Sequence, residues 1–256
     1  MHNNKILFIV EGNNDEVSFV RCLLDKCYAR HPYDLYSYQC NIHVLAQVLH
    51  DEYPNFEEDE IDLQLVLKSK EENEDKCTIL SQKYRDVFLI FDFDPQHDHP
   101  HFDTVERMLA YFSESSNHGK LFINYPMMQS YKHFALLPDD SFETRKVSIT
   151  ECHEYKRIVN DMSNFTDITH YSYKTFVSLM VHHIKKANKI LTGNYVIPSC
   201  DDYLSWNSAE IYNNQCNEVA TDSSVQVLNT SIFLGVDYRP SYFFQMIIRQ
   251  SCNYDI

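Results

Sequence analysis

The stretch KILFIVEGNNDE, residues 5–16, decides how the rest of the chain is interpreted. Ile6–Val10 is an unbroken apolar run, which is typical of a strand buried on both faces in a parallel sheet. The run ends at Glu11-Gly12, and a helical pattern begins near Asp15. A carboxylate is therefore expected at the carboxyl end of a buried strand, where open α/β sheets bind their ligands.

A second strand with acids at its end is predicted in the stretch VFLIFDFD, residues 87–94. Asp92 and Asp94 are two positions apart, so on a strand both side chains would point to the same side. Together with Glu11 and Asp15 they would form a cluster of four carboxylates. Such a cluster suits a hard cation, Mg²⁺ or Mn²⁺, because the acids would otherwise repel one another. Each acid alone has an ordinary structural explanation, so the prediction depends on the combination.

The order of predicted elements indicates an α/β fold with a mainly parallel, doubly wound sheet over residues 1–135. Beyond the two strands above, we expect helices at 15–28, 42–49, 77–84 and 105–112, and strands at 33–38, 61–67 and 121–123. The strand at 61–67 is predicted from its alternating leucines. Helical patterns at 151–161, 172–191 and 207–219 predict that residues 136–256 form a largely helical extension packed on this domain.

Composition restricts the classes of function. The formal net charge is −15, which argues against a surface built for nonspecific nucleic-acid binding but leaves room for a local basic groove. Lys185 and Lys189, one helical turn apart, form the best basic patch, although a solvated helix face is the commoner explanation. The eight cysteines have no zinc-like spacing, and no apolar run is long enough for a membrane. Reduced thiols in the cytoplasm, with no membrane association, are therefore expected.

The two acidic motifs carry a family resemblance. Glu11-Gly-x-x-Asp15, followed by a strand that ends in Asp92-x-Asp94, resembles the Toprim domain of topoisomerases, primases, OLD-family nucleases and small ribosomal-RNA maturation nucleases. The resemblance covers residues 1–135 and implies a compact parallel β/α fold with acids around Mg²⁺. It implies that Glu11 is a metal ligand or general acid/base and that Asp92 and Asp94 hold metal. Asp15 would match the extra acid of the OLD-type nucleases, which use two metals.

One departure from this pattern concerns the segment after the next strand. The OLD-type nucleases place a glutamate there, whereas this chain has Gln129. A neutral amide would weaken one metal site. Natural divergence, an engineered change and a shifted alignment all remain open as explanations. Lys132, three residues further on, is the candidate for a phosphate-facing lysine, and Gln129 and Lys132 complete the predicted catalytic set.

The resemblance implies a metal-dependent nuclease that acts on DNA or RNA, an effector of bacterial anti-phage defence. The chain is too short for a topoisomerase and lacks the zinc module of a replicative primase. It has no Walker A motif, so a partner ATPase of the ABC or AAA type would be a separate chain. A homo-oligomer is left open. One alternative is a noncatalytic binding or regulatory subunit with a degenerate site. Another is a phosphatase or phosphotransferase with Asp92 as nucleophile. The position of Asp92 after a later strand of the sheet counts against this alternative.

Overall fold

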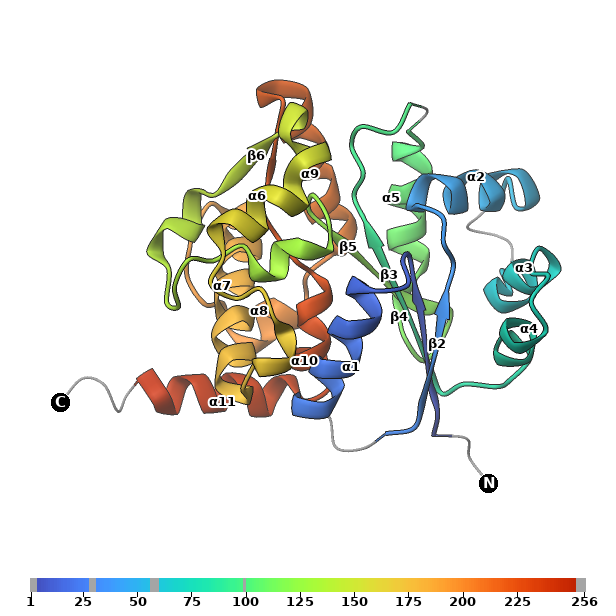
Figure 1. Cartoon of the computed structure of the whole chain (residues 1–256), viewed down its shortest axis with the longest axis horizontal. Coiled ribbons are helices and arrows are strands. Elements are labelled where there is room, and N and C mark those ends of the chain that lie inside the picture. The colour runs from blue at the N-terminus through green and yellow to red at the C-terminus, as the bar shows by residue number, and fades with distance from the viewer. Residues whose placement is uncertain (1–3, 28–30, 56–59, 99, 252–256) are drawn as a thin grey trace.

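The fold was taken from a computed structural model, which describes residues 4–27, 31–55, 60–98 and 100–251. Its centre is a five-stranded sheet in the order β2-β1-β3-β5-β4 (Figure 1). The strands are β1 (Ile6–Val10), β2 (Tyr33–Ser37), β3 (Asp86–Asp92), β4 (Ser113–Glu114) and β5 (Gly119–Asn124). All pairings are parallel except the short edge pairing of β4 with β5. The predicted α/β class with a mainly parallel sheet is confirmed.

The apolar run of the first strand forms because β1 lies inside the sheet. Every residue of Ile6–Val10 is buried, and each is paired on one side with β2 and on the other with β3. A strand with neighbours on both edges and helices over both faces has no solvated side, so it shows no alternation of polar residues. The same reasoning applies to Phe88–Phe91 at the centre of β3.

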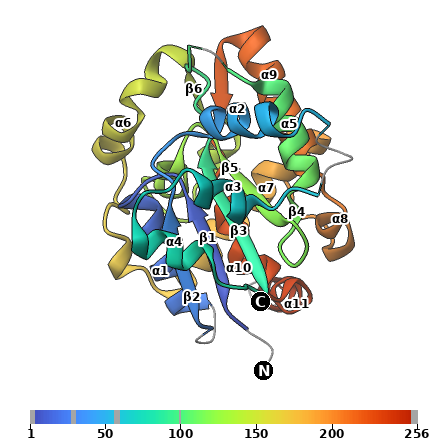
Figure 2. The ribbon, with the colours of Figure 1, turned by 90° about the vertical axis from the view of Figure 1, so that its right-hand side faces the viewer.

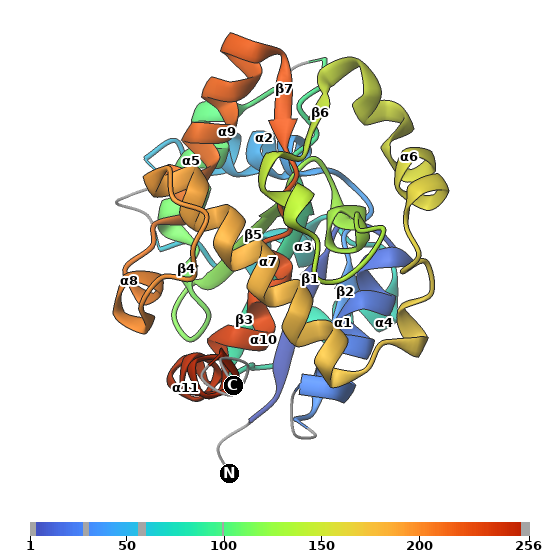
Figure 3. The ribbon, with the colours of Figure 1, turned by 90° about the vertical axis from the view of Figure 1, so that its left-hand side faces the viewer.

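Helices cover both faces of the sheet (Figures 2 and 3). One layer consists of α2 (Ile42–Glu52), α3 (Leu63–Ser69), α4 (Glu74–Leu80) and α5 (Phe102–Tyr111). The opposite face carries α1 (Asp15–Cys27), α7 (Tyr173–Thr192) and α10 (Leu234–Asp237). The remaining α-helices are α6 (Tyr155–Met162), α8 (Cys200–Leu204), α9 (Ser208–Asp222) and α11 (Pro240–Ser251). None of the described helices is long and apolar enough to cross a membrane.

The sheet has a topological switch point between β1 and β3. The chain leaves β1 through α1 and returns as β2 on one side, whereas it leaves β3 through α5 and returns as β5 on the other side. The helices α1 and α5 lie on opposite faces (Figure 1). The loops after β1 and β3 therefore diverge at the kind of position where open α/β sheets bind ligands. Glu11 and Asp92 lie at this point.

The strand predicted at 61–67 is wrong, because this segment forms helix α3. The Asp62 side chain accepts a hydrogen bond from the backbone N–H of Leu65 and caps the helix. Leu63, Val66 and Leu67 are buried at helical spacing, whereas Leu65 is 59% exposed. Of the three alternating leucines, Leu63 and Leu67 thus lie in the core and Leu65 lies outside it. The next helix, predicted at 77–84, begins earlier, at Glu74.

The second half of the chain is largely helical, as predicted, and it contacts the sheet directly. Five short 3₁₀ helices occur at η1 (Met128–Lys132), η2 (Asp140–Thr144), η3 (Ile149–Glu154), η4 (Ile168–His170) and η5 (Ser231–Phe233). A small antiparallel pair, β6 (Lys146–Ser148) and β7 (Ser224–Gln226), was not predicted. Tyr125, just after β5, exchanges backbone hydrogen bonds with Leu228 at 2.7 and 2.9 Å. The prediction of a boundary near residue 135 stays a prediction.

Candidate functional site

Glu11 and Asp92 meet at the switch point of the sheet. The backbone N–H of Asp92 donates to Glu11 Oε2 at 3.0 Å, and the N–H of Met128 donates to Asp92 Oδ1 at 2.7 Å. Burial raises the pKa of Glu11 to about 8, a shift that the bond from Asp92 opposes and the charges of Glu16 and Asp94 reinforce. Burial and the nearby Glu11 carboxylate also raise the pKa of Asp92. Two adjacent, half-buried carboxyl groups are thus held side by side.

Glu16, which the sequence analysis did not single out, is the third acid of this cluster. It lies in the first turn of α1, is 6% exposed, and its pKa is raised by burial and by the charge of Asp15. Its carboxylate lies over Gly12, where an added Cβ would be only 2.7 Å from Glu16 Oε2. Gly12 therefore leaves the space that this carboxylate occupies. Helical periodicity in the sequence could have indicated that Glu16 is buried, because it lies on the same face of α1 as Phe19, Val20 and Leu23.

Asp94 does not follow the strand geometry that the sequence analysis assumed. β3 ends at Asp92, and Asp94 has a left-handed backbone conformation with φ of 43°. Its Oδ2 accepts from Asn41 Nδ2 at 3.0 Å, and its carbonyl oxygen contacts His43 Nε2 at 3.2 Å. The argument that Asp92 and Asp94 share one side of a strand is therefore wrong. Asp94 remains close enough to contribute to the raised pKa of Glu11.

Two side chains of the protein bind the Asp15 carboxylate. Its Oδ2 accepts from Gln129 Nε2 at 2.5 Å and forms an ion pair with Lys156 at 3.3 Å. Gln129 is 2% exposed, and its Oε1 has no hydrogen-bond partner among the described residues. A buried acceptor without a partner is costly and indicates a place for a bound group. Lys156 comes from α6, 141 positions away, and no local sequence signal identifies it.

Lys132 lies on the same short helix as Gln129, η1, and its ammonium is near the Asp15 carboxylate. In a 3₁₀ helix residues i and i+3 eclipse each other, so the side chains of Gln129 and Lys132 project to the same side of η1. Lys132 is 9% exposed, and its ammonium forms no hydrogen bond or ion pair with any described residue. Burial lowers the pKa of Lys132, and the charge of Asp15 partly opposes this effect. A lysine that is buried along most of its side chain, lies beside Asp15 and has no partner among the described residues is suited to bind an anionic group.

The chemistry of the acids fits a hard divalent cation. Glu11, Glu16 and Asp92 offer only oxygen donors, which Mg²⁺ and Mn²⁺ prefer, and a bound cation would offset the burial and the mutual repulsion that raise their pKa values. Within the described part of the chain, no three His, Cys, Asp or Glu side chains form a preassembled ligand group. The predicted metal ligands stay a prediction; the structure places Glu16 with the acids and binds Asp15 to Gln129 and Lys156.

The basic patch predicted on α7 is largely occupied by internal contacts. Lys189 pairs with Glu143 at 2.8 Å, and the Lys185 ammonium lies 4.3 Å from the centre of the Tyr195 ring. Lys186, between them, is fully buried and donates to backbone carbonyl oxygens. All the cysteines in the described residues are free thiols.

Comparisons with known proteins add no relative to this description. No family model, no curated protein and no solved structure matches the chain. The functional interpretation therefore depends on the acids, the amide and the lysines at the switch point.

Proposed function

We propose that the chain is a metal-dependent nuclease that hydrolyses phosphodiester bonds of DNA or RNA. The observation that carries the proposal is the half-buried pair Glu11 and Asp92, joined at the switch point of a parallel sheet with buried Glu16 beside it. Among the described residues, no cationic side chain bonds to any of these three carboxylates. When these carboxyl groups ionise they need an opposite charge, and a cation from solution can supply it.

Each side chain would have a distinct role. Glu11, Glu16 and Asp92 would hold Mg²⁺ or Mn²⁺ through oxygen atoms. When bound, the cation would act as a Lewis acid toward the phosphodiester and assist deprotonation of the attacking water. Lys132 would neutralise charge on the phosphate as it develops in the transition state, with little competition from water because it is buried. This assignment puts Glu16 in the place first given to Asp15.

The overall charge supports local recognition of the substrate. With a net charge of −15, most of the surface repels nucleic acid, so we propose that the substrate is held mainly near Lys132 and Lys156. The resemblance to Toprim proteins supports a cytoplasmic role in anti-phage defence beside a separate ATPase chain.

A noncatalytic binding subunit is the second candidate, and the Gln129 contact favours it. Gln129 and Lys156 satisfy Asp15 without a metal. In this case the acids would remain as a regulatory cation site without cleavage. The two functions differ in whether any nucleic acid is cut.

The test compares the unmodified chain with Glu11→Gln, Glu16→Gln and Gln129→Glu on plasmid, single-stranded DNA and tRNA, in Mg²⁺ or Mn²⁺. Glu210, an exposed acid in the first turn of α9, provides the matched control Glu210→Gln. We expect cleavage by the unmodified chain and the control, and a loss of at least about 100-fold in Glu11→Gln and Glu16→Gln. Calorimetric titration with Mn²⁺ should show weaker binding in the same two variants. Mn²⁺ binding without cleavage by any variant would support the noncatalytic candidate, and unchanged binding in both would refute the cation site.

A further inference from the structure

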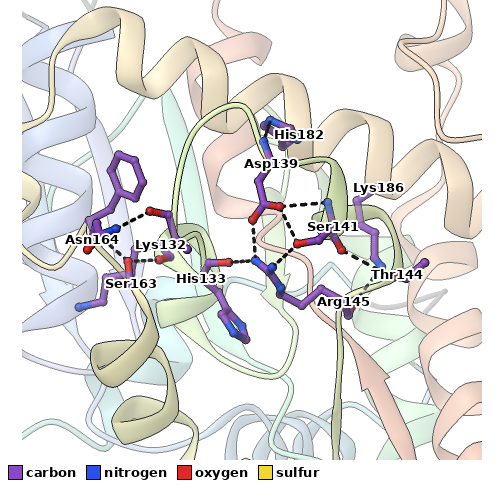
Figure 4. A network of polar contacts seen from close by, with 12 residues as sticks. Lys132, His133, Asp139, Ser141, Thr144, Arg145, Ser163, Asn164, His182 and Lys186 are labelled. Carbon is purple, nitrogen blue, oxygen red and sulfur yellow. Dashed lines mark hydrogen bonds and ion pairs between the residues drawn. The ribbon is translucent and has the colours of Figure 1, made fainter.

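The end of η1 is fixed by side chains from a distant part of the sequence. Three backbone carbonyl oxygens accept hydrogen bonds there: Lys132 from Ser163 Oγ at 2.6 Å, His133 from Arg145 Nη1 at 2.5 Å, and Ala135 from Asn164 Nδ2 at 2.6 Å. Figure 4 shows that the donors approach from two sides, Ser163 and Asn164 on one and Arg145 on the other. We call Arg145, Ser163 and Asn164 the carbonyl clamp.

The clamp's guanidinium is itself held in place. Arg145 forms an ion pair with Asp139 at 3.0 Å and a hydrogen bond with Ser141 Oγ at 2.6 Å (Figure 4). The two charged side chains are only 14% and 8% exposed, and Asp139 accepts further bonds from Ser141. Lys186 Nζ donates to the Arg145 carbonyl oxygen at 3.1 Å. A buried ion pair with this many partners fixes geometry, because each partner restricts the orientation of the planar guanidinium.

The start of η1 is also held. The amide of Met128 donates to Asp92, and its carbonyl oxygen accepts from Asn229 Nδ2 at 3.0 Å. Ser130 Oγ donates to the Leu228 carbonyl oxygen at 3.2 Å. Both ends of η1 are therefore connected to residues beyond position 135, and its N-terminal amide contacts the acid cluster.

We propose that Arg145, Ser163 and Asn164 are positioning residues that hold the Lys132 ammonium beside Asp15. A 3₁₀ helix of five residues has weak internal hydrogen bonds and needs outside support to keep one conformation. A lysine without a partner favours solvent, so Lys132 stays buried only while the backbone that carries it is fixed. The role of Lys132 toward a substrate rests on the proposed function, whereas its dependence on the clamp does not.

The test measures how fast each lysine of the full chain reacts with an amine-acylating reagent, read by mass spectrometry after proteolysis. In the unmodified chain, buried Lys132 should react slowly and exposed Lys156 quickly. Ser163→Ala and Arg145→Gln should each raise the rate at Lys132 at least about fivefold, the factor for the one hydrogen bond that each side chain donates to a carbonyl oxygen at the end of η1. The rate at Lys156 should stay unchanged. Ser163→Thr keeps the hydroxyl and should restore slow labelling.

Lys189→Gln is the matched control, because it breaks the bond to Glu143 in η2 and leaves the η1 carbonyls untouched. Its rate at Lys132 should equal that of the unmodified chain. An unchanged rate at Lys132 in folded Ser163→Ala would overturn the proposal, as would an equal rise in the Lys189→Gln control. If Arg145→Gln does not fold by circular dichroism, the comparison of Ser163→Ala with Ser163→Thr decides alone.

The same variants separate this inference from the proposed function. If the chain is a nuclease, Ser163→Ala should lower kcat about fivefold and leave KM nearly unchanged, because Lys132 acts on charge that develops in the transition state while Lys156 still holds the substrate. If no variant cleaves any substrate, the proposed function fails while the labelling experiment still decides the clamp. If cleavage occurs but labelling does not respond to Ser163→Ala, the clamp alone is refuted.

Discussion

Replacement of Glu11 by glutamine should stabilise the protein in alkaline, metal-free buffer. The pKa of Glu11 rises from about 4.5 to about 8 on folding, mainly because the carboxyl group is buried. Between these values the folded state binds more protons than the unfolded state, so stability falls as the pH rises through this window. At 1.36 kcal/mol per pH unit, the full cost above pH 8 is about 5 kcal/mol. Glutamine keeps an oxygen that can accept the hydrogen bond from Asp92.

The assay is urea unfolding in EDTA at pH 5.0, 6.5, 8.0 and 8.5, followed by circular dichroism. The unfolding free energy of Glu11→Gln minus that of the unmodified chain should be below about 1 kcal/mol at pH 5.0 and reach at least about 2 kcal/mol at pH 8.5. Part of the full 5 kcal/mol will be lost because Asp92 ionises more readily once Glu11 is neutral. Mg²⁺ at 100 times its Kd should return about 2.7 kcal/mol to the unmodified chain at pH 8.5.

The contributions of all other titrating groups cancel in this difference of unfolding free energies. For the control Glu210→Gln, the same difference should not change with pH. A difference of the same size at every pH would refute the reasoning. So would a variant less stable than the unmodified chain at pH 8.5. In either case Glu11 would be compensated by partners that the structure does not contain.

Three further predictions concern the glycine of the first motif and the helix α3. Gly12→Ala should change the unfolding free energy by less than about 1 kcal/mol, because the mobile end of Glu16 can shift, yet it should weaken Mn²⁺ binding in calorimetric titration. Unchanged Mn²⁺ affinity would refute the role given to Glu16. Asp62→Ala removes the cap of α3 and should cost about 1 kcal/mol in urea unfolding, with no effect expected if the segment were a strand. Leu67→Ala should cost about 2–4 kcal/mol, whereas exposed Leu65→Ala should cost less than about 0.5 kcal/mol; similar costs would contradict the helix.

The sequence reveals the parts of the fold that burial alone determines. The apolar runs of β1 and β3 are readable because a strand inside a covered sheet has no polar face. The position of Glu11 next to Asp92 also follows, since neighbouring parallel strands bring their carboxyl ends together. The segment 61–67 was misread because leucine alternation fits a strand and a capped short helix equally, and only the exposure of Leu65 distinguishes them.

The less predictable parts of the site depend on contacts over long sequence distances. Asp15 was assigned to the acids from its spacing to Glu11, but its partners are Gln129 and Lys156, which lie more than 100 positions away. Glu16 could have been found from the apolar stripe of α1. The hydrogen bond from Ser163 to the Lys132 carbonyl oxygen is a side-chain contact with backbone, and a backbone carbonyl carries no residue-specific signal.

The carbonyl clamp also affects how the protein could be engineered. A mutational library restricted to the two acid-bearing strand ends would sample the proposed metal ligands but not the proposed support of Lys132, which lies between residues 145 and 164. Substitutions in that interval can change the orientation of one lysine without altering the charge of the site. Graded replacements at Ser163 would therefore adjust the site from outside, in steps as small as a single hydrogen bond.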